Sequence, residues 1–203
     1  MLSDVSFRWK NAFNDYSLAL LRLGCAYNFY KTNSVAAGIA FTTSFNYNNP
    51  DHGELRIWQE LNIPSQKGRV FFSNRLRLEE RFFEKIIADK FSNNINFNYR
   101  LRYRLYFSVP LNHSTFLPGT LSINLGNEVF VNFGNEIIYN TLDANRLLAG
   151  MNYQITKNCF VTLNYMSQFG QKNIKNTYEQ NDVLWLSFTH TIERAANPTA
   201  AKN

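Results

Sequence analysis

One alternating stretch, residues 97–109, restricts the folds open to this chain more than any other feature of the sequence. Its odd-numbered positions carry only Phe, Tyr, Leu and Val, whereas its even-numbered positions include Arg100, Arg102 and Arg104. Successive side chains of a β-strand point to opposite sides of the sheet, so this pattern predicts a strand with one apolar and one cationic face. A helix would mix the two sets around its circumference. The strand therefore needs an apolar environment on one side and a polar one on the other.

The same alternation recurs along most of the chain and predicts an all-β fold with a single domain over residues 1–192. A polar tail, residues 193–203, follows. Only residues 83–91 could form a helical turn, within a loop. Glu80 breaks the alternation on the apolar side, which a strand end at the lipid headgroups or a β-bulge would explain. The predicted strands are residues 5–10, 21–29, 35–45, 54–63, 70–83, 97–109, 121–133, 146–155, 159–168 and 183–192.

Such strands suit the wall of an outer-membrane β-barrel, with the apolar face toward lipid and the arginines toward the lumen. We expect an antiparallel up-and-down transmembrane barrel with about 10 strands in this chain and 10–12 in the complete protein. Several connections are short and others, such as residues 46–53, are predicted to be long, as in barrels with short periplasmic turns and long external loops. Residues 1–4 lack the features of a secretion signal, so we expect the leader and a first strand to be missing from this sequence, through N-terminal truncation or a misplaced start codon.

Charge placement favours this orientation over a soluble lipocalin-like barrel, which would hold its apolar face inside. Six arginines on two neighbouring strands would repel one another on an exposed surface. In an enclosed lumen they can pair with the acids of the flanking strands, and the planar guanidinium suits such pairing. The predicted luminal charge stripe comprises Glu54, Arg56, Glu60, Arg75, Arg77, Glu79, Arg81, Arg100, Arg102, Arg104, Glu128 and Arg146.

Five segments together resemble a known family. They are residues 54–59, 74–82, 99–104, 126–130 and 143–150, in this order along the chain. The chain resembles domain-of-unknown-function family 2490, presumed outer-membrane barrels of Bacteroidota-type bacteria, over about residues 5–192. The resemblance implies a location in the outer membrane and a barrel fold. It supplies no catalytic residue, because the family has no established activity.

No group of residues in the sequence forms a convincing catalytic, cofactor or metal site, so we expect none. His113 and Ser114 are adjacent but lack a nearby acidic residue to orient the histidine. Asp51 and His52 are too few for a metal site, and His190 is expected on the outward face. Cys25 and Cys159 lie on the apolar faces of strands that are distant in sequence, which argues against a disulfide or metal site.

Two roles remain open for the luminal stripe. It could be a salt-bridged plug in a structural or assembly component of the outer membrane, or it could line a narrow pore that prefers anions. A lipid-modifying enzyme and a soluble ligand carrier are the alternatives. Membrane lipid, with a lipopolysaccharide leaflet outside, is the expected partner. Nucleic acid is not expected, because Tyr99 and Tyr103 point away from the face that carries the arginines, so bases could not stack beside the cations. The solute or protein partner is left open.

Overall fold

In the part of the chain that the structure describes, eleven β-strands form a single antiparallel sheet. A computed structural model of the protein describes residues 2–10, 14–30, 32–46, 48–87, 90–92, 94–134, 140–171 and 176–190. The predicted polar tail lies outside these residues. The strands are β1 (Leu2–Lys10), β2 (Asp15–Tyr30), β3 (Asn33–Asn46), β4 (Asn49–Lys67), β5 (Val70–Ile87), β6 (Lys90–Phe91), β7 (Asn96–Pro110), β8 (Leu121–Phe133), β9 (Leu142–Thr156), β10 (Cys159–Gln171) and β11 (Tyr178–His190).

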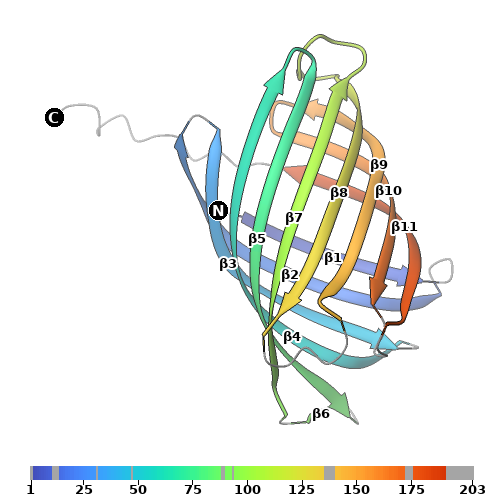
Figure 1. Cartoon of the computed structure of the whole chain (residues 1–203). Coiled ribbons are helices and arrows are strands. Elements are labelled where there is room, and N and C mark those ends of the chain that lie inside the picture. The colour runs from blue at the N-terminus through green and yellow to red at the C-terminus, as the bar shows by residue number, and fades with distance from the viewer. Residues whose placement is uncertain are drawn as a thin grey trace.

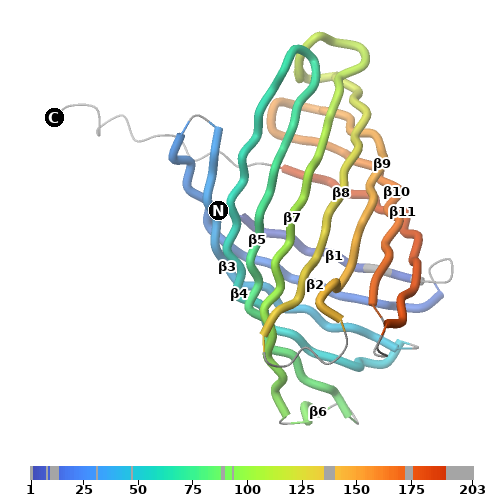
Figure 2. The backbone as a smooth tube through the Cα atoms, in the orientation of Figure 1, coloured from blue at the N-terminus to red at the C-terminus, as the bar shows by residue number. Residues whose placement is uncertain are grey.

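The strands follow one another in a meander that curls into a half-barrel (Figure 1). Each strand pairs with its neighbours in the chain, except that the short β6 folds back on β5, and β7 takes the next place in the sheet. The backbone trace shows the β5–β6 hairpin projecting beyond the other connections at its end (Figure 2). Among the described strands, β1 pairs only with β2, and β11 pairs only with β10. The antiparallel all-β prediction is confirmed, whereas the described sheet is open along a seam between β1 and β11.

Three local predictions are wrong. Residues 83–91 form no helical turn where they are described, because β5 continues to Ile87 and pairs with Lys90 and Phe91. The connection after β3 is a tight turn, with Asn48 at a φ of 66°, instead of a long loop. Glu80 lies at no bulge, because both neighbours of β5 keep their register through it. It lies in mid-strand on the outer face, where its Oε1 is 3.4 Å from Gln59 Nε2.

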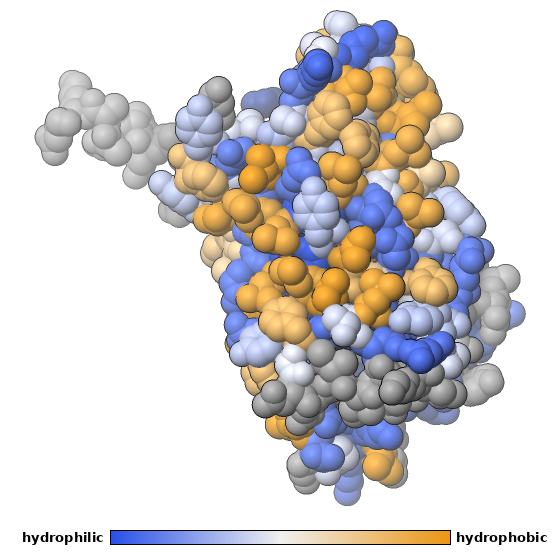
Figure 3. Space-filling view, viewed as in Figure 1, coloured by the Kyte–Doolittle hydropathy of each residue, from blue (hydrophilic) through white to orange (hydrophobic). Residues whose placement is uncertain are grey.

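The two faces of the curled sheet differ sharply in chemistry. Apolar side chains cover the convex face, for example Leu101, Tyr103 and Leu125, which are 36%, 47% and 55% exposed. In the space-filling view, apolar side chains spread widely over the visible face, with polar ones between them (Figure 3). The concave face carries Arg100 and Arg102, which are 8% and 9% exposed. The alternation in the sequence therefore separates an apolar exterior from a charged interior. No helix in the described residues is long and apolar enough to cross a membrane.

Small residues on β2 and β3 make room for a large aromatic side chain in the interior. Gly24 and Gly38 are direct cross-strand partners. Trp58, on β4, is 2% exposed and lies directly over them, so that a Cβ added at Gly24 would be 2.5 Å from the indole. The small concave residues of β2 and β3 thus provide the space in which this indole is buried.

A folded loop covers one end of the half-barrel, between β7 and β8. Thr120, at the end of this loop, is fully buried. Gly119 N donates to Gln154 O at 2.7 Å and Gln154 N donates to Thr120 O at 2.9 Å, which joins the loop to β9. Phe116 lies edge-on to Phe71 of β5 with ring centroids 6.0 Å apart. We call residues 111–120 the cap loop.

Arg69, in the turn between β4 and β5, holds the cap loop in place. Its Nη2 lies 2.8, 3.2 and 2.9 Å from the carbonyl oxygens of Pro110, Leu111 and His113. Hydrogen bonds from a charged donor contribute about 1.5–3 kcal/mol each. We expect Arg69→Ala to increase amide hydrogen exchange in the cap loop by about tenfold or more, while the strands stay protected.

The matched control for this experiment is Gln66→Ala. Gln66 lies beside the same turn and donates to Gly68 O at 3.0 Å, without a contact to the cap loop among the described residues. Its loss should leave exchange in the cap loop unchanged. Equal exchange in the Arg69→Ala protein and the parent would show that the three carbonyl contacts do not order the loop.

Candidate functional site

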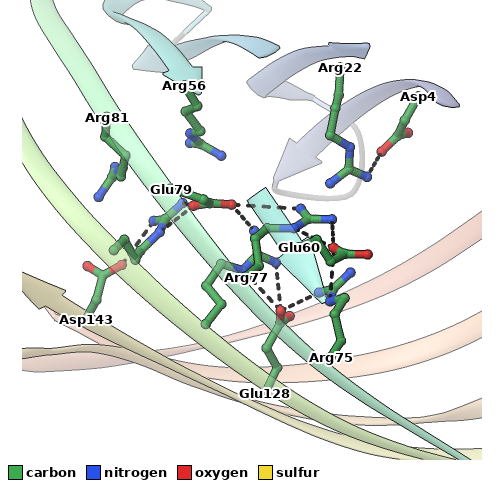
Figure 4. Close-up of polar contacts among 12 residues, drawn as sticks. Asp4, Arg22, Arg56, Glu60, Arg75, Arg77, Glu79, Arg81, Glu128 and Asp143 are labelled. Carbon is green, nitrogen blue, oxygen red and sulfur yellow. Dashed lines mark hydrogen bonds and ion pairs between the residues drawn. The ribbon is translucent and has the colours of Figure 1, made fainter. Parts of the chain in front are cut away.

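Among the charged residues that the structure describes, Glu79 is the most buried, and it lies at the centre of the concave face. Its side chain is 2% exposed and accepts hydrogen bonds from two arginines of the neighbouring strand β7 (Figure 4). Arg100 Nε lies 2.8 Å from Glu79 Oε2, and Arg102 Nη1 lies 2.6 Å from Glu79 Oε1. Arg77 Nη1 is 3.8 Å from the same Oε1. One carboxylate is therefore surrounded by three guanidinium groups with little access to water.

Two further carboxylates extend this arrangement on either side. Glu128 Oε1, on β8, accepts from Arg75 Nη2 at 2.5 Å and from Arg102 Nη2 at 2.8 Å. Glu60 Oε2, on β4, accepts from Arg77 Nε at 2.7 Å. The contact between Arg75 and Glu128 joins β5 to β8 across the intervening β7, because the curvature of the sheet brings these side chains together. The ion pairs thus connect four strands through the interior.

Three more acidic residues complete the group, which we call the charge network. Glu54 accepts from both Arg56 and Arg81, with its Oε1 2.7 and 2.5 Å from their Nε atoms. Asp4, on β1, pairs with Arg22 on β2. Asp143 Oδ2, on β9, lies 3.1 Å from Arg100 Nη1.

A β-bulge directs Asp143 into the interior. The β8–β9 register shifts at this point, so that Ala144 and Leu142 pair with consecutive residues of β8 and Asp143 is left as the additional residue. A bulge changes the direction in which a side chain points. Strict alternation would have placed Asp143 on the outer face. The bulge instead provides a carboxylate for Arg100.

Two aromatic rings lie among these charges. Phe130 is 1% exposed, and the Cζ atoms of Arg146 and Arg102 lie 4.4 and 4.6 Å from its ring centroid. Trp58 lies 5.0 Å from the Cζ of Arg77. Guanidinium groups at these distances are attracted to the negative face of the ring. The rings therefore stabilise cations and fill space that water would otherwise occupy.

All twelve residues of the predicted charge stripe lie on the concave side, and eleven of them take part in ion pairs within 4.0 Å. Arg104 is the twelfth: it lies opposite Glu128 on β8 but forms no such pair in the described part of the chain. Five residues of the site were not predicted from the sequence pattern: Trp58, Phe130, Asp4, Arg22 and Asp143. Trp58 and Phe130 could have been predicted from the alternation, because they occupy even-numbered positions, like Glu60 and Glu128 on the same strands. The bulge at Asp143 has no comparable signal.

None of the three histidines contacts a residue of the charge network in the described part of the chain. His113 Nδ1 is 3.0 Å from Thr120 Oγ1 and so forms part of the cap loop. His52 Nδ1 is 2.5 Å from Asp51 Oδ2, and both residues lie on β4 instead of in a loop. His190 is exposed at the end of β11 and lies opposite Cys159. The contact of His113 with Thr120 is structural, because it ties the two ends of the cap loop together.

The fold and the site define a class of protein: a half-barrel of antiparallel strands with an apolar convex face and a buried network of arginines and acids. The model of the family described as "Protein of unknown function (DUF2490)" matches residues 1–179. The chain belongs to this family, as the sequence resemblance indicated. No curated protein and no solved structure matches the chain.

Proposed function

We propose that the protein is a β-barrel component of a bacterial outer membrane, with its convex face in contact with lipid and its charge network closing the interior. The main support for this proposal is the difference between the two faces of the sheet. The convex face exposes Leu, Ile, Phe and Tyr side chains, and the concave face holds ion pairs that involve four strands. Lipid accepts an apolar surface, and a transmembrane strand needs only about 9–11 residues. The long strands, β2–β5 and β7–β11, have at least 13 residues each.

Aromatic contacts near the two ends of the outer face support this proposal. Toward one end, Phe97 and Tyr99 of β7 pack against each other, and Tyr99 stacks on Phe133 at 5.3 Å. Toward the other end, Phe107 lies 5.2 Å from Phe72. Ten residues of a strand tilted by about 40° rise by about 25 Å, the height of an outer-membrane apolar band. Phe97 and Phe107 have the separation expected of two interfacial aromatic girdles.

The packing of the network favours a structural role over an open pore. Glu79, Glu128 and Arg77 have side chains that are only 2%, 5% and 5% exposed, so little water reaches the middle of the concave face. A conducting pore needs a continuous water-filled path. We therefore assign the network the role of a salt-bridged plug that also fixes the curvature of the sheet.

A narrow anion-preferring pore is the second candidate, and one observation favours it. The charge network together with Arg104 holds more arginines than acids: nine guanidinium groups and six carboxylates. The arginines are Arg22, Arg56, Arg75, Arg77, Arg81, Arg100, Arg102, Arg104 and Arg146, and the acids are Asp4, Glu54, Glu60, Glu79, Glu128 and Asp143. A surplus of fixed positive charge favours anions.

Membrane extraction and single-channel recording test the proposal together. The protein should remain in the outer-membrane fraction after alkaline extraction, and planar bilayers that contain it should show no unitary conductance steps. Chloride-selective conductance steps would contradict the plug and support the anion-preferring pore. Recovery as a folded monomer without detergent would contradict both and support a soluble barrel. Lipid turnover lost in His113→Ala would instead support the enzyme alternative.

A further inference from the structure

A cavity of about 450 Å³ lies in the interior, at the end of the half-barrel that the cap loop covers. The strands β5 and β7–β11 line it with residues near their ends beside the cap loop, and the loop itself contributes Phe116. None of the described lining residues belongs to the charge network. Its volume lies within the range of about 300–1,000 Å³ that is typical of small-molecule sites. The cavity is therefore a candidate binding site separate from the charge network.

Aromatic side chains form a large part of the cavity wall. They come from three strands and from the cap loop: Phe71, Tyr106, Phe116 and Phe160. The faces of aromatic rings carry partial negative charge and attract groups with partial positive charge, such as C–H bonds. A ligand that fits this wall presents an apolar face of C–H groups.

The rest of the lining consists of three amide and three hydroxyl side chains, which can both donate and accept hydrogen bonds. Two of the amides have a free donor. Asn124 Oδ1 accepts from Ser108 Oγ at 2.6 Å, and Asn152 Oδ1 accepts from Thr162 Oγ1 at 2.8 Å. In the described part of the chain, the Nδ2 atoms of both asparagines donate to no protein group, and neither is a fully buried atom. Both nitrogens can therefore donate to a ligand in the cavity.

No charged side chain is among the described residues that line the cavity. An anionic ligand would find no cation in the wall. A cationic ligand would find no acid, and Arg104 lies beside the wall, with its Cζ 5.4 Å from the ring centroid of Tyr106. Burying a charge without a partner is costly. The lining thus favours an uncharged ligand.

We propose that this cavity binds an uncharged sugar. A pyranose ring has a face of C–H groups that can pack on the aromatic side chains. Its edge carries several hydroxyl groups, each of which can accept a hydrogen bond from Asn124 or Asn152 and donate to a neighbouring oxygen. Sugar binding requires neither conduction nor a membrane, so this site goes beyond the proposed function.

Calorimetric titration of the full chain tests the site, in a detergent without a sugar head group. The probes are glucose, galactose, mannose and N-acetylglucosamine, and at least one of them should bind saturably. Cyclohexanol keeps a six-membered ring but has a single hydroxyl, so it should bind at least about tenfold more weakly than the tightest of these sugars. Glucosamine is cationic and should also bind at least about tenfold more weakly.

Phe116→Ala removes one aromatic wall and should weaken binding of the tightest sugar by about fivefold or more. This variant should fold, because Phe116 lies in the cap loop and takes no part in strand pairing. Leu117→Ala is the matched control. Leu117 is the next residue of the same loop, but it is exposed and is not part of the lining, so this variant should bind like the parent protein.

Asn152→Leu provides a second variant, on a strand. Leucine has a similar size but cannot donate, so binding should weaken by about threefold or more. The control is Asn127→Leu, because Asn127 lies on the outer face and donates to Asn145 Oδ1 at 3.0 Å. It should bind sugar like the parent protein.

Four results would each overturn the proposal. They are no saturable binding of any of the four sugars, binding of cyclohexanol or glucosamine as tight as that of the best sugar, unchanged affinity in Phe116→Ala or Asn152→Leu, and an equal loss of affinity in the two control variants. None of these results bears on membrane insertion, so the sugar site and the proposed function can fail separately.

Discussion

Replacing Glu79 with glutamine should destabilise the protein by about 3–5 kcal/mol, because buried guanidinium groups then lose the charge that neutralises them. Glutamine keeps the shape of the side chain, so the effect isolates the charge. Arg100 and Arg102 both bond to Glu79, which is 2% exposed, and neither can turn to water without leaving the interior. The free energy of unfolding in urea, measured on protein refolded in detergent or lipid, gives the size of the loss.

The next residue along the chain provides the matched control. Glu80 is chemically identical but points to the convex face, where its contact is with Gln59 at 3.4 Å. Glu80→Gln should change the free energy of unfolding by about 1 kcal/mol or less. Equal effects of the two substitutions would contradict the assignment of faces, and so would a larger loss at Glu80.

Adding a single methyl group at Gly38 should also be strongly destabilising. A Cβ at this position would lie 2.0 Å from Leu23 O, 2.6 Å from the Gly24 Cα and 2.7 Å from the Trp58 indole. Two of these atoms belong to the backbone of the paired strand and cannot move away independently, so β2 and β3 must separate. Overpacking of this kind costs about 1–3 kcal/mol, and we expect Gly38→Ala to fall at the upper end of that range. The same unfolding measurement gives its size.

Gly170→Ala is the control for this substitution. The atom nearest to a Cβ added at Gly170 would be Nε2 of Gln168, 3.2 Å away at the flexible end of that side chain. Alanine in a strand is favoured over glycine by about 0.5–1 kcal/mol, so this variant should be neutral or slightly more stable. If Gly38→Ala were equally neutral, the burial of the Trp58 indole would not depend on the space that Gly24 and Gly38 leave open.

Most of the fold was predictable from the period of the sequence, because a two-residue alternation determines both the element and the face of each side chain. The stretch around Arg100 and Arg102 illustrates this: alternation put the arginines and Leu101 on opposite faces, and the acids on the flanking strands then favoured an interior position for the arginines. The turn after β3 was not predictable, because residues 49–53 lack the apolar alternation but still pair along β3. The end of β5 was wrongly predicted as a helical turn for a related reason. Residues 84–87 show no clear two-residue alternation, and their pairing with β6 depends on the hairpin that follows.

The charge network was predictable as a set of residues but not as a set of contacts. Parity assigns Glu128 to the same face as Arg75, Arg102 and Arg104, yet it cannot say which arginines obtain the carboxylate. That outcome depends on curvature, which brings β5 within reach of β8, and on the bulge that supplies Asp143 to Arg100. In this competition Arg104 is left with no carboxylate within 4.0 Å among the described residues, an outcome that is visible only in three dimensions.

The meander has two open borders in the described sheet, β1 and β11. Both expose backbone N–H and C=O groups that lack a neighbouring strand in the described sheet. Free borders recruit further strands, and hydrocarbon does not tolerate them. Because β1 and β11 are different strands, a contact between two copies would join β11 of one to β1 of the next, head to tail. Repeated contacts of this kind form a ring if the rotation between successive copies adds up to a full turn, and a fibre if it does not. In water these borders would therefore favour association between chains, whereas inside a bilayer they would need to pair with each other or with a further strand.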